Sequence, residues 1–259
     1  MTSINSFLEK HKDEHIHIRR PVELDDVGAL TAQADETVVF ENIEGYPGFR
    51  LVDNLFCNRK VQARVLGCEP SEVVKCLAEV LRRGPHPLEE SDGGPCQEEV
   101  FLGDDVDLGK IPIVRHTAKD PYPYSTSFVV HQDPETGEYN QMFPRCGVLS
   151  RNEMVASFVT ATANRILAKH RTAGTKMPQA IVIGTHPAWE LVGCYSYPHS
   201  GWWEFELFEA VTGEVGVVTK CKTIDLVVPV EASIVIEGYV NPTRTAQDGP
   251  SPGPTMLYT

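Results

Sequence analysis

The sequence predicts an α+β fold in which helices dominate the first third of the chain and short strands dominate the rest. Helical spacing of apolar residues is found at Val22–Ala34 and again from Ser71 to Arg83. From Glu98 onward the pattern changes to short β-type runs, which turns rich in Gly, Pro and Asp separate. The 259 residues, 41% of them hydrophobic, suffice for one large domain or two modest ones with a real core.

The first elements follow one another closely. A short polar helix is expected at residues 3–15, and an amphipathic helix is expected at Val22–Ala34, where the apolar residues recur at helical spacing. Thr37–Phe40 and Arg50–Leu55 read as strands, and a turn rich in helix and strand breakers, residues 44–48, lies between them.

A further helix is expected to begin at Ser71. Its hydroxyl is a typical N-cap, and Glu72 would lie in the first turn. One face would carry Val73, Val74, Leu77, Val80 and Leu81. The Gly and Pro residues of Arg83–Pro87 predict where this helix ends.

The rest of the sequence predicts many short strands and one helix. This helix is expected from about Asn152 to His170, with Gly174 at its end. Such a pattern is typical of a barrel or a sandwich. The expected strands are Glu98–Leu102, Ile111–Arg115, Ser127–Val130, Ala180–Gly184, Val215–Cys221, Asp225–Val228 and Ser233–Val240.

Charge and cysteine usage exclude several classes of function. The formal net charge of −13 predicts a surface that repels nucleic acid and anionic membranes, so we expect neither as a partner. The 7 cysteines form no Cys-x-x-Cys pair, which favours free thiols in a reducing compartment over a disulfide framework or a zinc site. No apolar stretch is long enough to span a membrane, and the N-terminus is too polar for a signal peptide. We therefore expect a cytoplasmic protein.

The run Tyr139–Arg145 is the strongest candidate for a site. It places an amide, Asn140, and a guanidinium, Arg145, a few residues apart on one extended segment. A polar oxygen can ligate a hard cation, and an Arg fork can clamp a carboxylate or a phosphate. Taken alone, the run is equally compatible with a solvated hairpin.

Several further segments carry a family resemblance through their order and spacing. They are Phe40–Gly48, Gly103–Leu108 followed by Ile111–Ile113, Asp133–Gly137 leading to Asn140 and Arg145, Pro178–Gly184, Lys220-Cys221 with Asp225 and Val228-Pro229, and Ile234–Gly238. Together they resemble the UbiD-like family of (de)carboxylases that use prenylated FMN. The resemblance covers nearly the whole chain.

The resemblance implies an N-terminal α/β domain, residues 1–110, and a central split β-barrel of the flavin-binding type, residues 111–259, as the cofactor-binding domain. Family members carry a third, C-terminal domain that builds oligomers and covers the active site. This chain ends where the barrel is being completed, so we expect a short form that lacks this domain.

Site residues carry over one by one. Asn140 and Glu204 match the family's metal ligands, which help a divalent ion, Mn or Mg, hold the cofactor phosphate; K is a further candidate ion. Arg145 matches the catalytic Arg that pairs with the substrate carboxylate, and Thr126 matches a residue that lines the cofactor site. In the same run, Phe143, Pro144 and Arg145 are expected at the prenylated FMN. Glu204 also reads as an exposed surface acid beside two Trp residues.

Two positions depart from the family pattern. The family has a metal-ligating His on the helix after the Arg, but residues 155–164 contain no His. The family's Glu-Gly-Pro-Phe-Gly-Glu loop reads Asp-Gly-Pro-Ser-Pro-Gly here, so Asp248 stands for the first acid and Gly253 for the second. Asp248 is the candidate catalytic acid, although Asp-Gly-Pro is also ordinary turn chemistry.

The resemblance thus implies non-oxidative, reversible decarboxylation of an aromatic or α,β-unsaturated carboxylic acid. The expected partners are this small acid and either a second copy of the chain or a partner subunit that supplies the missing C-terminal elements. Two alternatives stay open: a non-catalytic or partial subunit that needs a partner chain, and a flavin-binding split barrel with other chemistry.

Overall fold

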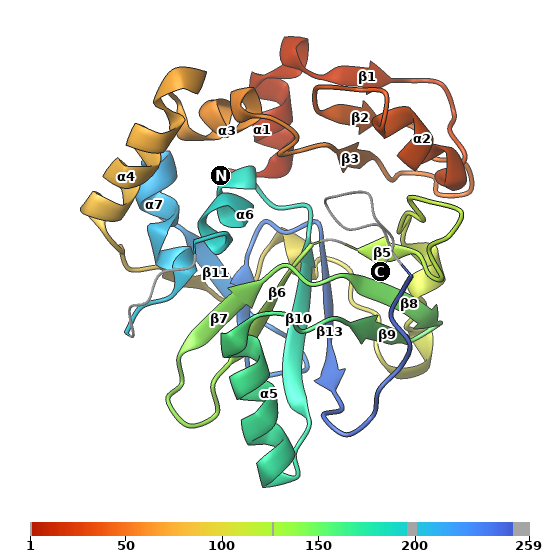
Figure 1. Cartoon of the computed structure of the whole chain (residues 1–259), viewed down its shortest axis with the longest axis vertical. Helices are drawn as coiled ribbons and strands as arrows, with labels where there is room; N and C mark the ends of the chain where they lie inside the picture. The colour runs from red at the N-terminus through yellow and green to blue at the C-terminus, as the bar shows by residue number, and fades with distance from the viewer. Residues whose placement is uncertain (1, 126, 196–200, 251–259) are drawn as a thin grey trace.

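The described residues form four small sheets, most helices gather on the side of the N-terminal half, and α5 (Ala161–Ala173) lies apart on the central sheet (Figure 1). The computed structural model describes residues 2–125, 127–195 and 201–250. The sheet orders are β1-β2-β3, β13-β10-β6-β7, β12-β11-β4 and β5-β8-β9. The mixed α+β class is confirmed. The described residues form no closed barrel, so the split-barrel architecture and the division at residue 110 stay predictions.

The first sheet belongs to the N-terminal half. Strand β1 (Ile16–Ile18) runs parallel to β2 (Val38–Phe40), and β3 (Leu51–Asp53) pairs antiparallel to β2. Val39 of β2 packs in the largest core. Val38 and Phe40 of the same strand pack with a short helix, α2 (Val27–Thr31), which a 3₁₀ turn (Leu24–Asp26) precedes. The predicted helix at Val22–Ala34 is therefore confirmed in shortened form.

Helix α1 (Ile4–Lys10) begins at Ser3, whose side chain accepts a hydrogen bond from the amide of Ser6 in a capping box. A 3₁₀ turn (Lys12–Glu14) continues it. The buried face of α1, Ile4, Phe7 and Leu8, packs in the largest core among the described residues, which also takes in Val39 of β2.

Four helices gather beside α1 (Figure 1): α3 (Arg59–Leu66), α4 (Val73–Arg83), α6 (Pro187–Gly193) and α7 (Phe208–Thr212). The Asn58 side chain caps α3, which the sequence analysis did not predict. The prediction of Ser71 as an N-cap was wrong. Ser71 lies inside a 3₁₀ turn (Pro70–Glu72) that leads directly into α4, because Pro70 favours the first turn of a helix.

The central sheet joins β6 (Phe128–Gln132), β7 (Tyr139–Met142), β10 (Met177–Ile183) and β13 (Ile234–Val240), all antiparallel to their neighbours. Helix α5 (Ala161–Ala173) packs on one face of this sheet, against Val129 and Ile181. The opposite face contributes Phe128 and Val182 to the largest core. Because side chains alternate along a strand, each of these strands packs on two cores.

The two remaining sheets are assembled from distant segments. Strand β4 (Glu89–Ser91) pairs parallel with β11 (Val217–Lys220), which pairs antiparallel with β12 (Val227–Pro229). Strands β5 (Tyr124–Ser125), β8 (Cys146–Ser150) and β9 (Glu153–Ala156) form the other sheet. Four 3₁₀ turns complete the regular structure: Pro95–Gln97, Gly103–Asp105, Leu108–Lys110 and Glu204–Leu207 (η7).

Two strand predictions were wrong here, and one predicted helix is confirmed with a later start and with Gly174 as its C-cap. Glu98–Leu102 is not a strand, because Val100, Phe101 and Leu102 are exposed without a pairing partner among the described residues. Ile111–Arg115 is extended but enters no sheet. The helix predicted from Asn152 begins only at Ala161, because residues 153–156 pair with β8 as strand β9. The other predicted strands are present within a few residues of their expected bounds.

No helix within the described part of the chain has the length and apolar character required to cross a bilayer.

Candidate active site

Asn140 lies on β7 with its side chain buried, opposite His131 on β6. Its amide nitrogen donates to the carbonyl oxygen of Gln141 at 3.4 Å. Its Oδ1 is also buried, yet no described residue donates a hydrogen bond to it. An unsatisfied buried acceptor costs about 1–3 kcal/mol, so this oxygen is well suited to meet a ligand.

Glu204 begins η7 and approaches β7 at the residue after Asn140. Burial raises the pKa of Glu204 to about 7, although the backbone amides of Glu204 itself and of Gln141 lower it in part. Its Oε2 is buried and, among the described residues, has no hydrogen-bond partner. Asn140 therefore carries an unpartnered oxygen on β7, and Glu204 of η7 carries another and interacts with the backbone of the next residue of β7.

This pair of oxygens fits a hard divalent cation. Mg²⁺ and Mn²⁺ take carbonyl and carboxylate oxygens, whereas zinc prefers sulfur and nitrogen. The described residues contain no group of 3 or more His, Cys, Asp or Glu that could hold a metal by themselves. The prediction of Asn140 and Glu204 as metal ligands stays a prediction, but their donor chemistry is compatible with it.

The backbone around these two residues is held by aromatic and amide contacts. Tyr139 stacks on Trp203 with ring centroids 4.4 Å apart, which joins the residue before Asn140 to the residue before Glu204. The Gln141 amide donates to the carbonyl oxygen of Trp189 at 3.1 Å. Gly193 lies against the same amide, since a Cβ built there would be 2.2 Å from the Gln141 side chain.

The buried carboxyl of Glu231 holds the start of α6, the helix that contacts Gln141. Glu231 accepts hydrogen bonds from Trp189 Nε1 at 2.7 Å and from the backbone amide of His186 at 3.2 Å. Burial raises the pKa of Glu231 to about 7. Glu231 thereby fixes the start of α6, and α6 in turn fixes Gln141.

Arg145 follows β7 and meets Asp248 from the end of the described chain. Arg145 Nη2 donates to Asp248 Oδ2 at 3.0 Å, and Tyr124 Oη donates to Asp248 Oδ1 at 2.9 Å. The Arg145 guanidinium also lies 5.7 Å from the centre of the Tyr124 ring. Burial, followed by the hydrogen bond to Asp248, raises the pKa of Tyr124 to about 12, so the phenol stays a donor. The structure thus brings the two predicted catalytic residues together.

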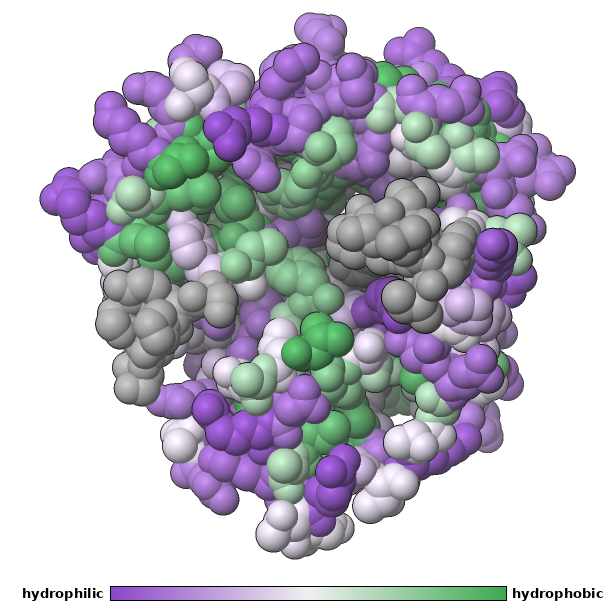
Figure 2. All heavy atoms as spheres, viewed as in Figure 1, coloured by the Kyte–Doolittle hydropathy of each residue, from purple (hydrophilic) through white to green (hydrophobic). Residues whose placement is uncertain are grey.

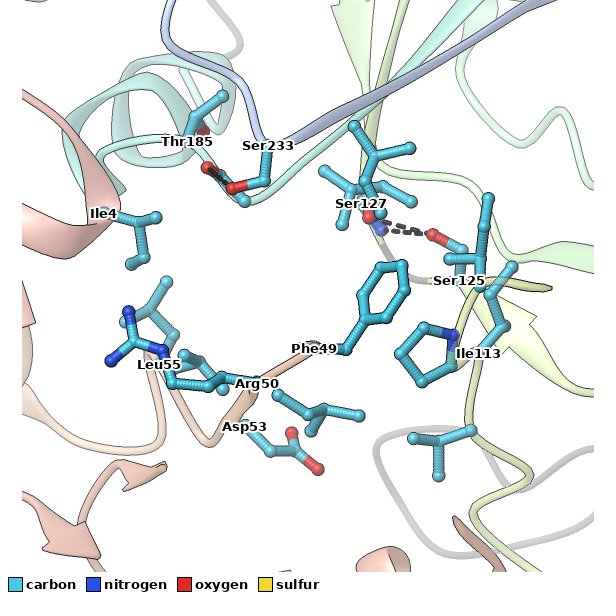
Figure 3. Close-up of a pocket in the computed structure, with 18 of the residues that line it drawn as sticks. Ile4, Phe49, Arg50, Asp53, Leu55, Ile113, Ser125, Ser127, Thr185 and Ser233 are labelled. Atoms are coloured by element: carbon cyan, nitrogen blue, oxygen red, sulfur yellow. Dashed lines mark hydrogen bonds between the residues drawn. The ribbon is translucent and has the colours of Figure 1, made fainter. Parts of the chain in front are cut away.

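A cavity of about 660 Å³ opens between the N-terminal sheet and the central sheet. Figure 3 shows Phe49 in its middle, with Thr185 and Ser233 on one side and Ser125 and Ser127 on the other. Tyr124 lines this cavity as well, so one residue belongs both to the cavity wall and to the Arg145–Asp248 pair. Figure 2 shows hydrophobic residues gathered toward the hollow in this face, with hydrophilic residues around the periphery.

The other predicted site residues are placed as follows. Phe143 is half-buried and packs edge-on against Phe128, and Pro144 is buried beside it, so both have a packing role in the described structure. Thr126 lies outside the described residues. Thr160, within the region where the family carries its His, accepts a hydrogen bond from the amide of Ala163 and caps α5.

Four residues of this site were not predicted: Tyr124, Gln141, Glu190 and Glu231. Gln141 could have been noticed, because a strand that points Asn140 to one face must point its neighbour to the other. Nothing local in the sequence marks Tyr124 or Glu231, whose hydrogen-bond partners lie far along the chain, or Glu190, which lines the cavity from α6.

Comparison with known proteins decides the family. Residues 6–81 match the 3-octaprenyl-4-hydroxybenzoate carboxy-lyase N-terminal domain, and residues 88–258 match the Rift-related domain of the same carboxy-lyases. The chain belongs to the UbiD family. UbiD-family membership confirms the resemblance seen in the sequence and places the chain in a family of carboxy-lyases.

Solved UbiD-class structures superimpose closely on the chain. An evolved dimeric form of HmfF from Pelotomaculum thermopropionicum in complex with prFMN is 27% identical, with a TM-score of 0.92, over 100% of this chain and 62% of that chain. The structure of HmfF from the same organism in complex with FMN is 27% identical, with a TM-score of 0.92, and the match covers 99% of this chain and 59% of that chain. Vanillic acid decarboxylase from Sedimentibacter hydroxybenzoicus in its closed form is 25% identical, with a TM-score of 0.90, and the match covers 100% of this chain and 59% of that chain. The chain therefore spans about three fifths of these relatives.

Proposed function

We propose that the protein is a decarboxylase that uses prenylated FMN and acts on an aromatic or α,β-unsaturated carboxylic acid. The observation that carries the proposal is the Arg145–Asp248 pair beside a cavity wall. Membership of a carboxy-lyase family and the prFMN bound to HmfF support the choice of chemistry and cofactor.

Arg145 is the group that orients the substrate carboxylate. Only Nη2 of its guanidinium is engaged by Asp248, and Nε and Nη1 make no hydrogen bond with the described residues. A planar guanidinium that is fixed on one edge presents its other donors in a defined direction, which suits bidentate binding of a carboxylate. Asp248 and Tyr124 hold the guanidinium in this orientation.

Asn140 and Glu204 would hold a Mn²⁺ or Mg²⁺ ion against the cofactor phosphate, with phosphate oxygens and waters completing the ion's coordination. When bound, the prenylated flavin supplies the electron sink that makes loss of CO2 feasible. The protein's residues bind, orient and shield the reactants. Glu204 would have to lose its proton to hold such a cation, since a ligand carboxyl must be ionised.

The test is to co-express the chain with a flavin prenyltransferase and to record the absorbance spectrum and intact mass of the released ligand. Release of CO2 is then measured with vanillic acid, 3,4-dihydroxybenzoic acid and cinnamic acid. Bound prenylated FMN together with CO2 release supports the proposal. Ordinary FMN without decarboxylation would instead indicate a flavin protein with other chemistry.

A partial subunit is the second candidate, because the chain spans only about three fifths of its relatives. In that case the purified chain would bind no flavin and release no CO2. Activity would then require a second chain or second copy that covers the cavity. Size-exclusion chromatography with light scattering, before and after addition of flavin, distinguishes these states.

A further inference from the structure

Glu190 places a carboxyl on the cavity wall that the proposed function has not used. It lies on α6 between Trp189 and Leu191, which are both buried in the largest core, whereas Glu190 itself lines the cavity. None of the described residues forms a hydrogen bond or an ion pair with its carboxyl, and burial is the sole cause that shifts its pKa. A protonated Glu190 carboxyl would therefore lie next to any ligand in the cavity.

The surroundings of Glu190 let about half of the molecules keep that proton at pH 7, and more of them below it. Burial raises the pKa of Glu190 to about 7. The charged and titratable groups that share the cavity wall are Arg50, Asp53, Cys57, His116 and Tyr124, and none of them contributes to this shift. On α6 itself, the Glu190 charge helps to raise the pKa of Cys194, after burial. A carboxyl kept protonated by an apolar site is a suitable general acid near neutral pH.

Decarboxylation requires such a donor. The bond between the substrate carbon and its carboxylate breaks, and the carboxylate group leaves as CO2. The bonding electron pair stays with the rest of the substrate until a proton is added at the carbon that carried the carboxylate. Asp248 is poorly placed to supply this proton, because it already accepts hydrogen bonds from Arg145 and Tyr124. The position of the second acid in the loop is held by Gly253, which has no side chain to titrate.

We propose that Glu190 is the proton donor of this reaction, delivering the carboxyl proton across the cavity to the carbon that loses CO2. This inference rests on the proposed decarboxylase function. The Glu190 carboxylate regains its proton from water that enters the cavity after the product leaves. The substrate accordingly lies in the cavity with its carboxylate toward Arg145 and its reacting carbon toward α6.

The experiment compares the wild-type chain with Glu190→Gln, and uses Glu138→Gln as a matched control, since Glu138 is an exposed glutamate in the turn before β7. Each protein is loaded by co-expression with the prenyltransferase, and the loading is checked by absorbance. With vanillic, 3,4-dihydroxybenzoic and cinnamic acids, Glu190→Gln should lower product formation by about 100-fold or more, the range of general acid catalysis. It should also abolish the fall in rate that the wild type shows as the pH rises through about 7.

Two further measurements separate proton transfer from folding and loading. Exchange of isotope-labelled carbon dioxide into the remaining substrate should persist in Glu190→Gln, because cleavage of the carbon–carbon bond precedes protonation. On the unloaded protein, the infrared band of a protonated carboxyl that titrates near neutral pH should be weaker in Glu190→Gln than in the control.

Equal rates for the wild type and Glu190→Gln would overturn the role of Glu190 and leave the decarboxylase function intact. Loss of both exchange and product in a correctly loaded Glu190→Gln would also overturn it, since the defect would then precede protonation. Loaded wild-type protein without CO2 release from any of the acids would overturn the proposed function, and the proton-donor role with it.

Discussion

Arg145 and Asp248 are 103 positions apart in the sequence, yet Arg145 Nη2 and Asp248 Oδ2 lie 3.0 Å apart. The contact joins the end of the central hairpin to the last part of the described chain. Tyr124 completes it by donating to the other oxygen of Asp248. A guanidinium held in this way is positioned before any substrate binds, which is the arrangement that lowers the cost of orientation during catalysis.

Arg145→Ala should reduce CO2 release by about 100-fold to 1,000-fold, the usual effect of losing one preorganised charge-stabilising group. The fold should be kept, because the ion pair is partly exposed and such pairs contribute about 1 kcal/mol or less. Steady-state kinetics and thermal unfolding check both statements. Arg151→Ala removes an exposed arginine as a control, and equal losses in the two variants would exclude the assigned role.

Substitution of Asn140 or Glu204, the two metal ligands that we propose, should weaken or abolish Mn²⁺ binding. Titration calorimetry on the flavin-free chain should show weaker or absent binding in Asn140→Ala and Glu204→Gln, and unchanged binding in Glu209→Gln. Because the pKa of Glu204 is raised to about 7, affinity should rise about tenfold per pH unit below 7 and level off above it. Affinity that does not depend on pH, or that survives both substitutions, would place the ion elsewhere.

Gly193→Ala should destabilise the protein even though Ala is the better helix former by about 1 kcal/mol. The new Cβ would meet the Gln141 amide at 2.2 Å and displace it from the Trp189 carbonyl. Overpacking of this kind costs about 1–3 kcal/mol. Gly238→Ala is the matched control, since nothing lies within 4 Å of its added Cβ. Urea unfolding of both variants decides the matter, and equal stabilities would contradict the predicted clash.

Glu231→Gln should stabilise the chain at high pH and not at low pH. The pKa of the folded-state carboxyl is about 7 against an ordinary 4.5, so the wild type loses stability as the pH rises from about 4.5 through 7. The neutral amide keeps an acceptor for Trp189 and escapes this loss, which is at most about 3–4 kcal/mol at about 1.4 kcal/mol per pKa unit. Urea unfolding at about pH 5 and about pH 8 measures the difference. A gain that is the same at both pH values would show that ionisation is not its cause.

The sequence predicted the local features of this fold better than the long-range ones. The strands β2, β6, β10 and β13 were found because their apolar runs are bounded by turn residues. The strand predicted at Glu98–Leu102 failed because propensity does not say whether a pairing partner is available. Helix α3 was missed because it is short and its apolar positions are few.

In the candidate site, too, local features were predicted from the sequence and long-range contacts were not. Asn140 and Arg145 were recognised because they lie on one extended segment, and Asp248 and Glu204 through family resemblance alone. Their spatial relations to Tyr124 and Gln141 depend on sheet pairing and helix packing across more than a hundred positions. The raised pKa of Glu190 is a property of burial, which no local pattern of residues reveals.

Helix α1 has a consequence for the order in which the chain becomes structured. Phe7 contacts His186 with ring centroids 5.4 Å apart, and the core that holds Ile4 and Leu8 also contains Phe205 and Leu226. During synthesis α1 is made well before Phe205 and Leu226, so its contacts with these two residues form only after the later segments have emerged. Until then its apolar face can pack only on earlier members of the same core, such as Val39 and Val65. Fusion partners placed directly before Ser3 would act on this late docking step.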